Sequence, residues 1–218
     1  MKQALIPLAL LAGLATAQHA NADQTYHFDS SLQGWQVVDG GLYSHAASGG
    51  NAGGYIEITD NTSADFQLQA PTSALGNWNS YLGGNLSFDA KNINGEASDW
   101  PNFGTITFTG AGLSLSRQVA ITSPGFLPDD GQWHTFSIAL TPALWGTELT
   151  TVFSNLASWH INAESHFGIS EVVGIDNIRL TAAAAPSPVP EPSAGLMALA
   201  GLGCIGWLAR RRKRLRHD

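Results

Sequence analysis

Residues 54–60, Gly-Tyr-Ile-Glu-Ile-Thr-Asp, carry the pattern that decides the fold class. Successive side chains of a β-strand point to opposite faces, so Ile56 and Ile58 would share one face while Glu57 lies on the other. This alternation of apolar and polar residues predicts strands with one buried face. It recurs at 86–91, 105–108, 113–116 and 134–140.

Such strands follow one another at intervals of roughly ten residues and are separated by Gly, Asn, Asp and Pro. No apolar stripe with helical periodicity is long enough to predict a helix among them. The sequence therefore predicts an all-β fold, an antiparallel β-sandwich of the jelly-roll type. An open barrel is the alternative.

The first 22 residues have the features of a signal peptide. Lys2 gives a positive start, an apolar stretch follows, and Ala20-Asn21-Ala22 has the small-x-small spacing of a cleavage site. Cleavage between Ala22 and Asp23 would start the mature chain at Asp23. Residues 23–181 are then expected to form one domain, since about 160 residues suffice for a single core.

The composition changes after Thr181. Residues 182–189 are rich in Ala and Pro and would form an extended linker. The apolar run 193–209 is a predicted transmembrane helix of about 25 Å, slightly short of the ~30 Å hydrocarbon core. The basic tail 210–218 would stay in the cytoplasm by the positive-inside rule.

The predicted domain is strongly acidic. It has fifteen Asp and Glu against three cations, Lys91, Arg117 and Arg179, a formal balance of −12 where the whole chain has −7. A surface of this sign repels phosphate backbones, so we expect no nucleic-acid partner. The only cysteine is Cys204, outside the domain, which excludes disulfides and thiolate metal sites within it.

Several segments together resemble the laminin B domain, also called laminin domain IV. The resemblance implies a non-catalytic extracellular β-sandwich related in fold to carbohydrate-binding modules. Laminin domains of this type lie among cysteine-rich repeats, which this chain lacks. The segments are FDSSLQGW (28–35), GGYIEITDNTSADFQLQAP (53–71), LGNWNSYLGGNLSFDAK (75–91), DGQWHTFSIALTP (130–142) and EVVGIDNIRL (171–180).

The tail, residues 190–218, resembles a PEP-CTERM sorting signal: Pro190-Glu191-Pro192, then the apolar run, then the basic block. The resemblance implies recognition by an exosortase-type membrane protease and an association with exopolysaccharide and biofilm matrix. The expected location is the inner membrane of a Gram-negative bacterium, transiently, and then the cell surface or extracellular matrix.

Aromatic side chains are the candidate ligand-binding residues, because an exposed ring can stack on the apolar face of a sugar. Trp78, Tyr81 and Trp100 occur among Gly, Asn and Pro, and Trp133 points away from the apolar face of its strand. A core position is the alternative for each. Trp35 is assigned to the core.

Asp176 is predicted to share a strand face with Ile178 and Leu180, where a carboxylate needs a partner. One interpretation is a structural Ca²⁺ bound by Asp176 and Asp29. The other is a carboxylate that accepts hydrogen bonds from backbone N–H groups. No cofactor beyond a possible calcium ion is expected.

No pattern of a catalytic centre emerges. Asp99 and the Asp129-Asp130 pair could be proposed as acids for glycoside hydrolysis, but Asp-Asp-Gly before a strand is more simply a turn. His134 lies on the apolar face of its predicted strand and is interpreted as a hydrogen-bonded core histidine.

The sequence thus predicts a non-enzymatic exported protein that binds carbohydrate or exopolysaccharide matrix. Two alternatives stay open. An enzyme acting on extracellular polysaccharide would bring two carboxylates into one groove, whereas a purely structural matrix protein would have no groove lined by aromatic rings.

Overall fold

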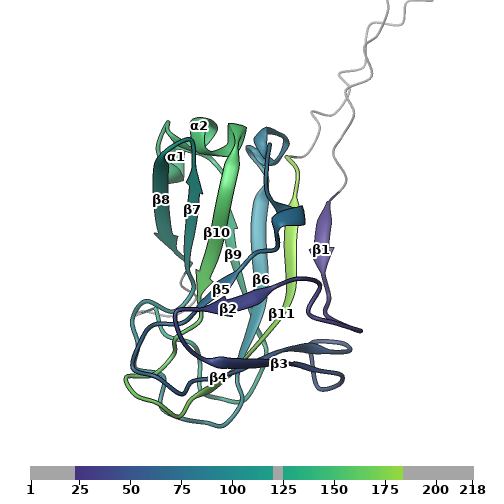
Figure 1. Ribbon diagram of the computed structural model, residues 1–218, viewed down its shortest axis with the longest axis vertical. Helices are drawn as coiled ribbons and strands as arrows, with labels where there is room; N and C mark the ends of the chain where they lie inside the picture. Colours follow the sequence, from purple (N-terminus) through teal and green to yellow (C-terminus); the bar gives the residue numbers. More distant parts are fainter. Residues whose placement is uncertain (1–22, 120–124, 184–218) are drawn as a thin grey trace, which may run out of the picture. The chain divides into compact units, whose positions relative to one another are not determined.

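The computed structural model describes residues 23–119 and 125–183. The predicted signal peptide, linker, transmembrane helix, sorting signal and basic tail lie outside these residues. Two antiparallel sheets face each other in the described part (Figure 1). The predicted β-sandwich is therefore confirmed.

The six-stranded sheet has the order β3-β4-β11-β6-β9, with β1 also paired to β11. Its strands are β1 (Gln24–Tyr26), β3 (Leu42–Ala46), β4 (Tyr55–Thr59), β6 (Asn85–Asn92), β9 (His134–Ala139) and β11 (Val172–Thr181).

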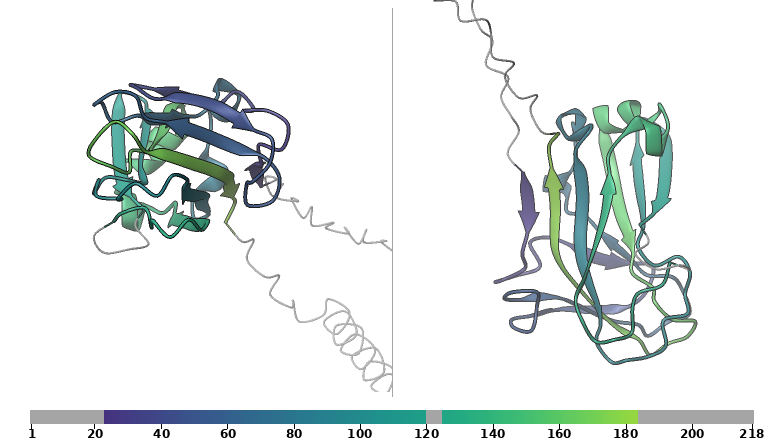
Figure 2. Two further views of the ribbon diagram at one scale, coloured as in Figure 1. Left: turned by 90° about the horizontal axis from the view of Figure 1, so that it is seen from below. Right: turned by 180° about the vertical axis from the view of Figure 1, so that it is seen from behind.

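The five-stranded sheet has the order β2-β5-β10-β7-β8. Its strands are β2 (Gln36–Val38), β5 (Gln67–Gln69), β7 (Thr105–Gly110), β8 (Leu113–Gln118) and β10 (Leu156–Asn162). Figure 2 shows this sheet packed against the other from two further sides.

Strand β11 organises the six-stranded sheet. Its first half pairs with β4 and its second half with β1, while β6 runs along its other side. Because β1 pairs with the end of β11, both described ends of the domain lie together, and the Ala182 N–H donates to Asp23 Oδ1 at 3.1 Å. Glu171, just before β11, lies at the opposite end of this strand.

Aromatic rings fill much of the space between the sheets. Trp35 and Trp159 are 1 % and 0 % exposed and meet edge to face at 4.9 Å between ring centroids. Trp78 contacts Trp159 and Phe108 in the same way. Burial of large rings in offset or edge contacts is a major source of stability in a core without disulfides. The expected core position of Trp35 is confirmed.

The expectation of strands throughout is wrong for the connections. Helices α1 (Pro142–Trp145) and α2 (Leu149–Ser154) follow β9, and the 3₁₀ turns η1 (Thr72–Ala74) and η2 (Asn79–Tyr81) follow β5. Each has only one or two turns, too short for a periodic apolar stripe. None of the helices in the described residues is long and apolar enough to cross a membrane.

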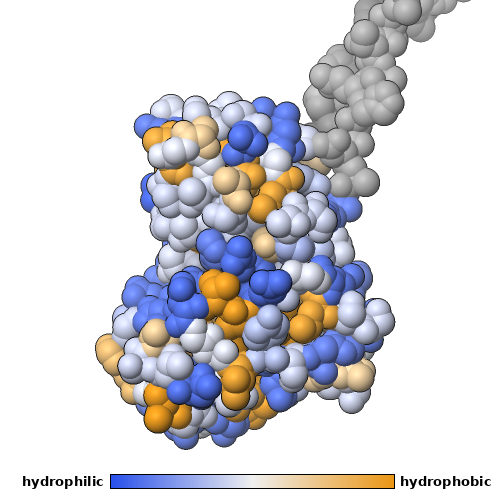
Figure 3. Space-filling model, viewed as in Figure 1, coloured by the Kyte–Doolittle hydropathy of each residue, from blue (hydrophilic) through white to orange (hydrophobic). Residues whose placement is uncertain are grey.

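Strand β8 also differs from its predicted pattern. Leu113 is 38 % exposed and Leu115 is only half-buried, because β8 lies at the edge of its sheet. The surface in Figure 3 mixes apolar patches with hydrophilic side chains. Phe167 and Ile169, in the connection before β11, are the most exposed large hydrophobic side chains of the described residues.

Candidate functional site

The outward face of the five-stranded sheet is built from amide, imidazole and hydroxyl side chains. Cross-strand pairing places five of them in one row, because residues opposite each other in a ladder share a face. The row, here called the polar row, runs from β2 to β8: Gln36, Gln69, His160, Thr107 and Ser116.

The neighbouring positions in these strands point inward. Leu68, Ile106 and Ile161 are all 0 % exposed and form part of the core. The apolar side chains of these strands thus pack in the core, and the polar side chains between them face solvent, where a ligand could bind. Within the polar row, Thr107 and Ser116 are joined by a hydrogen bond of 2.8 Å between their hydroxyl oxygens.

A shallow pocket of about 400 Å³ opens beside this row. Every lining residue has a polar side chain, which suits hydroxyl-rich ligands more than apolar ones. The lining residues are Asp39, Gln67, Asn102, Thr105, Thr107, His160 and Asn162.

His160 lies at the junction of the polar row and the pocket. Partial burial lowers the pKa of His160, and the negative charge of Asp39 opposes that shift. The ring is therefore neutral at pH 7. A neutral imidazole has one donor and one acceptor nitrogen, a pair that matches a sugar hydroxyl.

Trp78 cannot serve as the expected exposed platform. It is only 3 % exposed, lies within the aromatic core, and its indole N–H donates to the Ala74 carbonyl at 2.9 Å. That carbonyl belongs to the 3₁₀ turn η1, and the hydrogen bond holds the indole ring in the core. Tyr81 packs edge to face on Trp78 at 5.6 Å and is half-buried.

Trp133 and Trp100 lie in two different places. Trp133 is half-buried over the outer face of the six-stranded sheet, with its ring 5.5 Å from that of Tyr55. Trp100 packs against exposed Phe167 at 4.4 Å in the loops at the end of the sandwich, two residues before Asn102 of the pocket. Of the four predicted aromatic residues, Trp100 is thus the nearest in sequence to the pocket lining.

Asp176 is fully buried in β11, and its two oxygens accept the backbone N–H groups of Asn51 and Asn177 at 2.7 Å and 2.6 Å. Burial raises the pKa of Asp176 to about 6. Asp29 lies against Gly53, in the same Gly-rich loop that contains Asn51. Both proposed calcium ligands therefore approach one loop, and Ca²⁺ binding by Asp29 and Asp176 stays a prediction.

Asp89 joins this region as a second buried carboxylate. Its Oδ2 accepts the side-chain amides of Asn51 and Asn177, each at 2.9 Å, and its Oδ1 accepts the Thr135 hydroxyl at 2.6 Å. The two carboxylates are thus bridged by donors from the loop and from β11. Sequence reasoning missed Asp89 because its strand pattern alone places it on the polar face.

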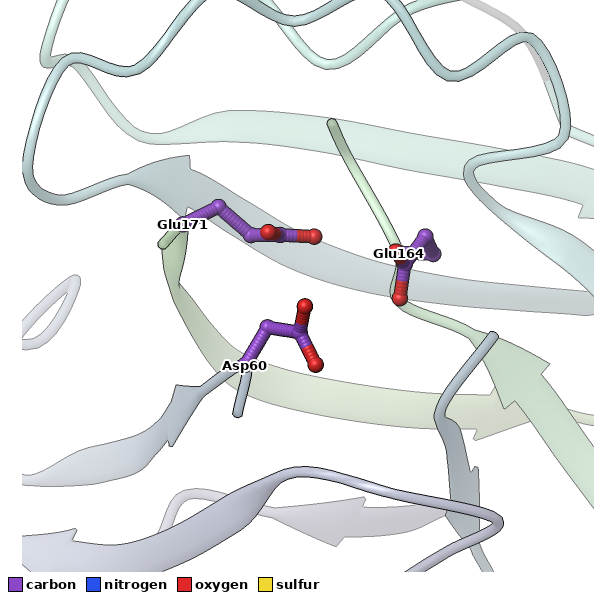
Figure 4. A group of neighbouring side chains, drawn as sticks. All are labelled: Asp60, Glu164 and Glu171. Atoms are coloured by element: carbon purple, nitrogen blue, oxygen red, sulfur yellow. The ribbon is translucent and has the colours of Figure 1, made fainter. Parts of the chain in front are cut away.

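Three further acids were not singled out from the sequence. Asp60 follows β4, Glu164 follows β10 and Glu171 precedes β11. Their carboxylate oxygens lie within 4.8 Å of one another in a buried cluster, and the side chains converge (Figure 4). Carboxylate oxygens in such an arrangement could hold a hard cation.

Two of the three acids considered for hydrolysis, Asp130 and Asp99, each contact a histidine. Asp130 Oδ1 lies 2.9 Å from His134 Nε2, and Asp99 Oδ1 lies 3.0 Å from His166 Nδ1. The bond from His134 lowers the pKa of Asp130. The His134 side chain is 27 % exposed, so it is hydrogen-bonded as predicted but lies at the margin of the core.

The comparisons with known proteins agree with these features. Residues 188–213 match the PEP-CTERM protein-sorting motif, which confirms the predicted sorting signal and indicates export and membrane-anchored sorting. None of the curated proteins matches the chain in sequence.

Among solved structures, the L4b domain of human laminin alpha-2 is 14 % identical with a TM-score of 0.53, over 75 % of this chain and 98 % of that one. The family 11 carbohydrate-binding module of a cellulosomal cellulase of Clostridium thermocellum is 17 % identical with a TM-score of 0.50, over 76 % and 98 %. The tandem CBM22 domain of Xyn10C from Paenibacillus barcinonensis is 17 % identical, TM-score 0.50, over 82 % and 50 %. The fold of the chain is therefore similar both to that of the laminin domain and to that of the carbohydrate-binding modules.

Proposed function

We propose that the chain is a non-catalytic surface protein that binds a neutral polysaccharide on the outward face of its five-stranded sheet. The observation that carries this proposal is the polar row beside a pocket of about 400 Å³, which presents mixed donors and acceptors, with Asp39 as its one carboxylate. Sugar hydroxyls need such mixed partners.

The charge of the domain narrows the ligand class. With a formal balance of −12 for residues 23–181, an anionic polymer would meet electrostatic repulsion. A neutral polymer, such as a glucan, a xylan or the cell's own neutral exopolysaccharide, would meet no such repulsion. Trp100 and Phe167 could extend the site with an aromatic surface beyond Asn102.

Catalysis is disfavoured by the burial of the carboxylates. Glu164 and Glu171 are the one pair of neighbouring glutamates with raised pKa values among the described residues. A raised pKa is what the general acid of a glycosidase needs. They are 4 % and 0 % exposed and do not line the pocket. A polysaccharide has no access to them, and the proposal is therefore a binding module.

Sorting completes the proposal. The signal peptide would direct export, the exosortase-type protease would act at Pro190-Glu191-Pro192, and the domain would remain at the surface of a Gram-negative cell or in its matrix. The Ala/Pro linker at 182–189 would separate the domain from the membrane.

A purely structural role is the second candidate, and one observation favours it: no aromatic residue lines the described pocket. Glycan-array screening of the full-length chain in detergent distinguishes the two. The binding proposal expects neutral β-glucans or xylans to be retained.

Two matched variants make the test specific. Gln67→Ala removes a pocket amide and should weaken glycan binding about 3- to 10-fold, the loss of one or two hydrogen bonds. Gln132→Ala, an exposed glutamine outside the pocket lining, should leave the affinity unchanged. Absence of any retained glycan would favour the structural role.

A further inference from the structure

The cluster of Asp60, Glu164 and Glu171 lies where three strands of both sheets end or begin. Asp60 and Glu171 belong to the six-stranded sheet through β4 and β11, and the Asp60 N–H donates to the Glu171 carbonyl at 3.0 Å. Glu164 follows β10 of the other sheet. The carboxylates therefore meet between the two layers.

Within the part of the chain that the structure describes, no ion pair involves these three acids. In the described ranges, the ion pairs are those of His134 with Asp130 and His166 with Asp99. Arg117 and Arg179 donate to the Leu144 carbonyl and to Asn177, away from the cluster. Three buried carboxylates without a counter-ion are unfavourable, because each charge loses its hydration.

In each of the three carboxylates, one oxygen accepts the hydrogen bonds. Asp60 Oδ1 accepts from Thr62 N–H at 3.1 Å, Glu164 Oε2 from Phe66 N–H at 3.3 Å, and Glu171 Oε1 from the N–H groups of Ser165 and His166. These bonds fix the directions of the side chains.

The carboxylate oxygens that accept no hydrogen bond give a second indication of a bound ligand. Asp60 Oδ2 and Glu171 Oε2 are buried and have no hydrogen-bond partner, although their residues are only 3 % and 0 % exposed. Figure 4 shows both carboxylates directed toward the space that they share with Glu164. The Ser165 hydroxyl, in a residue 1 % exposed, is likewise unpaired. Buried polar atoms in native proteins normally have partners, so unpaired oxygens that converge point to a ligand.

We propose that Asp60, Glu164 and Glu171 bind one Ca²⁺ ion that links the two sheets. The donors are all carboxylate oxygens, which favour a hard cation over zinc or copper. Calcium accepts bidentate carboxylates in irregular geometry, whereas Mg²⁺ retains several waters in a strict octahedron, for which a buried site of this kind is unsuited.

The electrostatics of the cluster agree with this assignment. Burial and then the charge of Glu171 raise the pKa of Glu164 to about 8, and burial raises the pKa of Glu171. A divalent cation removes the repulsion that causes part of these shifts. The site uses residues other than the predicted pair Asp29 and Asp176.

The test measures bound calcium and melting temperature in the full-length chain, purified in detergent and stripped with EGTA. At 100 times the dissociation constant, Ca²⁺ should raise the melting temperature by about 5–10 °C. Glu164→Gln with Glu171→Gln keeps the side-chain volumes, and this double variant should bind one calcium ion fewer per chain and lose the increase. Glu148→Gln, at an exposed glutamate outside the cluster, is the matched control and should retain both the bound calcium ion and the increase in melting temperature. Asp176→Asn separately tests the predicted pair Asp29 and Asp176.

If the double variant is weakly folded, a second comparison tests the proposal: the order of stability of Asp60→Asn and the unmodified chain should reverse between EGTA and Ca²⁺. In EGTA at pH 9, Asp60→Asn should be at least as stable as the unmodified chain, because it removes a buried charge, whereas in Ca²⁺ it should be less stable. The proposal is overturned if the unmodified chain binds no calcium, if the double variant binds as much, or if only Asp176→Asn abolishes binding. An equal increase with Mg²⁺ would overturn the assignment to calcium.

Discussion

Trp133 lies directly across Gly174 on the outer face of the six-stranded sheet. A Cβ atom at position 174 would stand 2.8 Å from Trp133 Cη2 and 3.2 Å from Tyr55 and Ile93 side-chain atoms. The indole N–H also donates to the Gly49 carbonyl at 3.2 Å. Because Gly174 has no side chain, the ring of Trp133 can pack against β11. It is therefore not the exposed platform that the sequence predicted.

Gly174→Ala should destabilise the domain by about 1–3 kcal/mol, since it forces atoms into a filled space. Urea unfolding followed by tryptophan fluorescence measures the change. In a Trp133→Leu background the cost of Gly174→Ala should fall, because the smaller side chain can retreat. An equal cost in both backgrounds would show that the ring contact is not the cause.

Trp78→Ala should cost about 3–5 kcal/mol, the range for deleting a buried aromatic side chain. The ring contacts Phe153, Phe108 and Trp159, and its N–H bond to Ala74 would also be lost. Trp100→Ala, at a partly exposed position, should cost much less by the same denaturation experiment. Similar losses for the two variants would contradict the assignment of Trp78 to the core.

The strands could be predicted because they depend on a local pattern. Ile56 and Ile58 are both 0 % exposed, as their alternation with Glu57 indicates. The same pattern could not place Trp78, because its burial depends on a turn whose carbonyl receives the indole N–H. Tryptophan is compatible with both a core and a ligand platform, and only tertiary contacts decide between them.

The sites were harder to predict than the strands. Asp60, Glu164 and Glu171 are over a hundred positions apart at the extremes, and nothing in their neighbours marks them as one cluster. The polar row could partly be read from the sequence, since Gln69 and His160 are polar residues that alternate with buried apolar ones in their strands. Its continuity across the sheet depends on strand order, which alternation does not specify.

Asn177→Ala should destabilise the domain by about 2–3 kcal/mol. The variant leaves Asp89 Oδ2 and the Asn51 carbonyl without the amide that donates to them at 2.9 Å and 2.8 Å. It also places Ala at a φ of +48°, which favours Asn or Gly. Asn177→Gly loses the same bonds without the strain and should be about 1 kcal/mol less damaging in thermal unfolding. Equal losses would assign the effect to the hydrogen bonds alone.

Glu164 should make stability depend on pH when calcium is chelated. Its pKa is raised from 4.5 to about 8 in the folded state, so the folded chain holds a proton that the unfolded chain has released. Stability therefore falls as pH rises through this window and levels off above about pH 8. Melting temperatures in EGTA from pH 5 to pH 9 should show the decline.

Glu164→Gln is the control for that decline. Glutamine cannot release a proton, so the part of the slope that Glu164 causes should disappear, while the contribution of Glu171 remains in the same direction. Saturating calcium should also reduce the slope in the unmodified chain, because the bound ion favours the ionised form. A slope unchanged by the substitution would contradict the assignment to Glu164.

Glu191→Ala should block processing of the tail. The sorting motif covers residues 188–213, in which Glu191 is the only acidic residue. The basic block that follows would stay in the cytoplasm, and a chain that is not cut would remain held by the apolar run 193–209. Intact mass spectrometry of surface material should find the basic block absent from the unmodified chain, and the variant retained in the membrane fraction at its uncut mass. Glu96→Ala, outside the motif, should be processed normally, and a basic block still attached to the unmodified surface protein would show a lasting anchor.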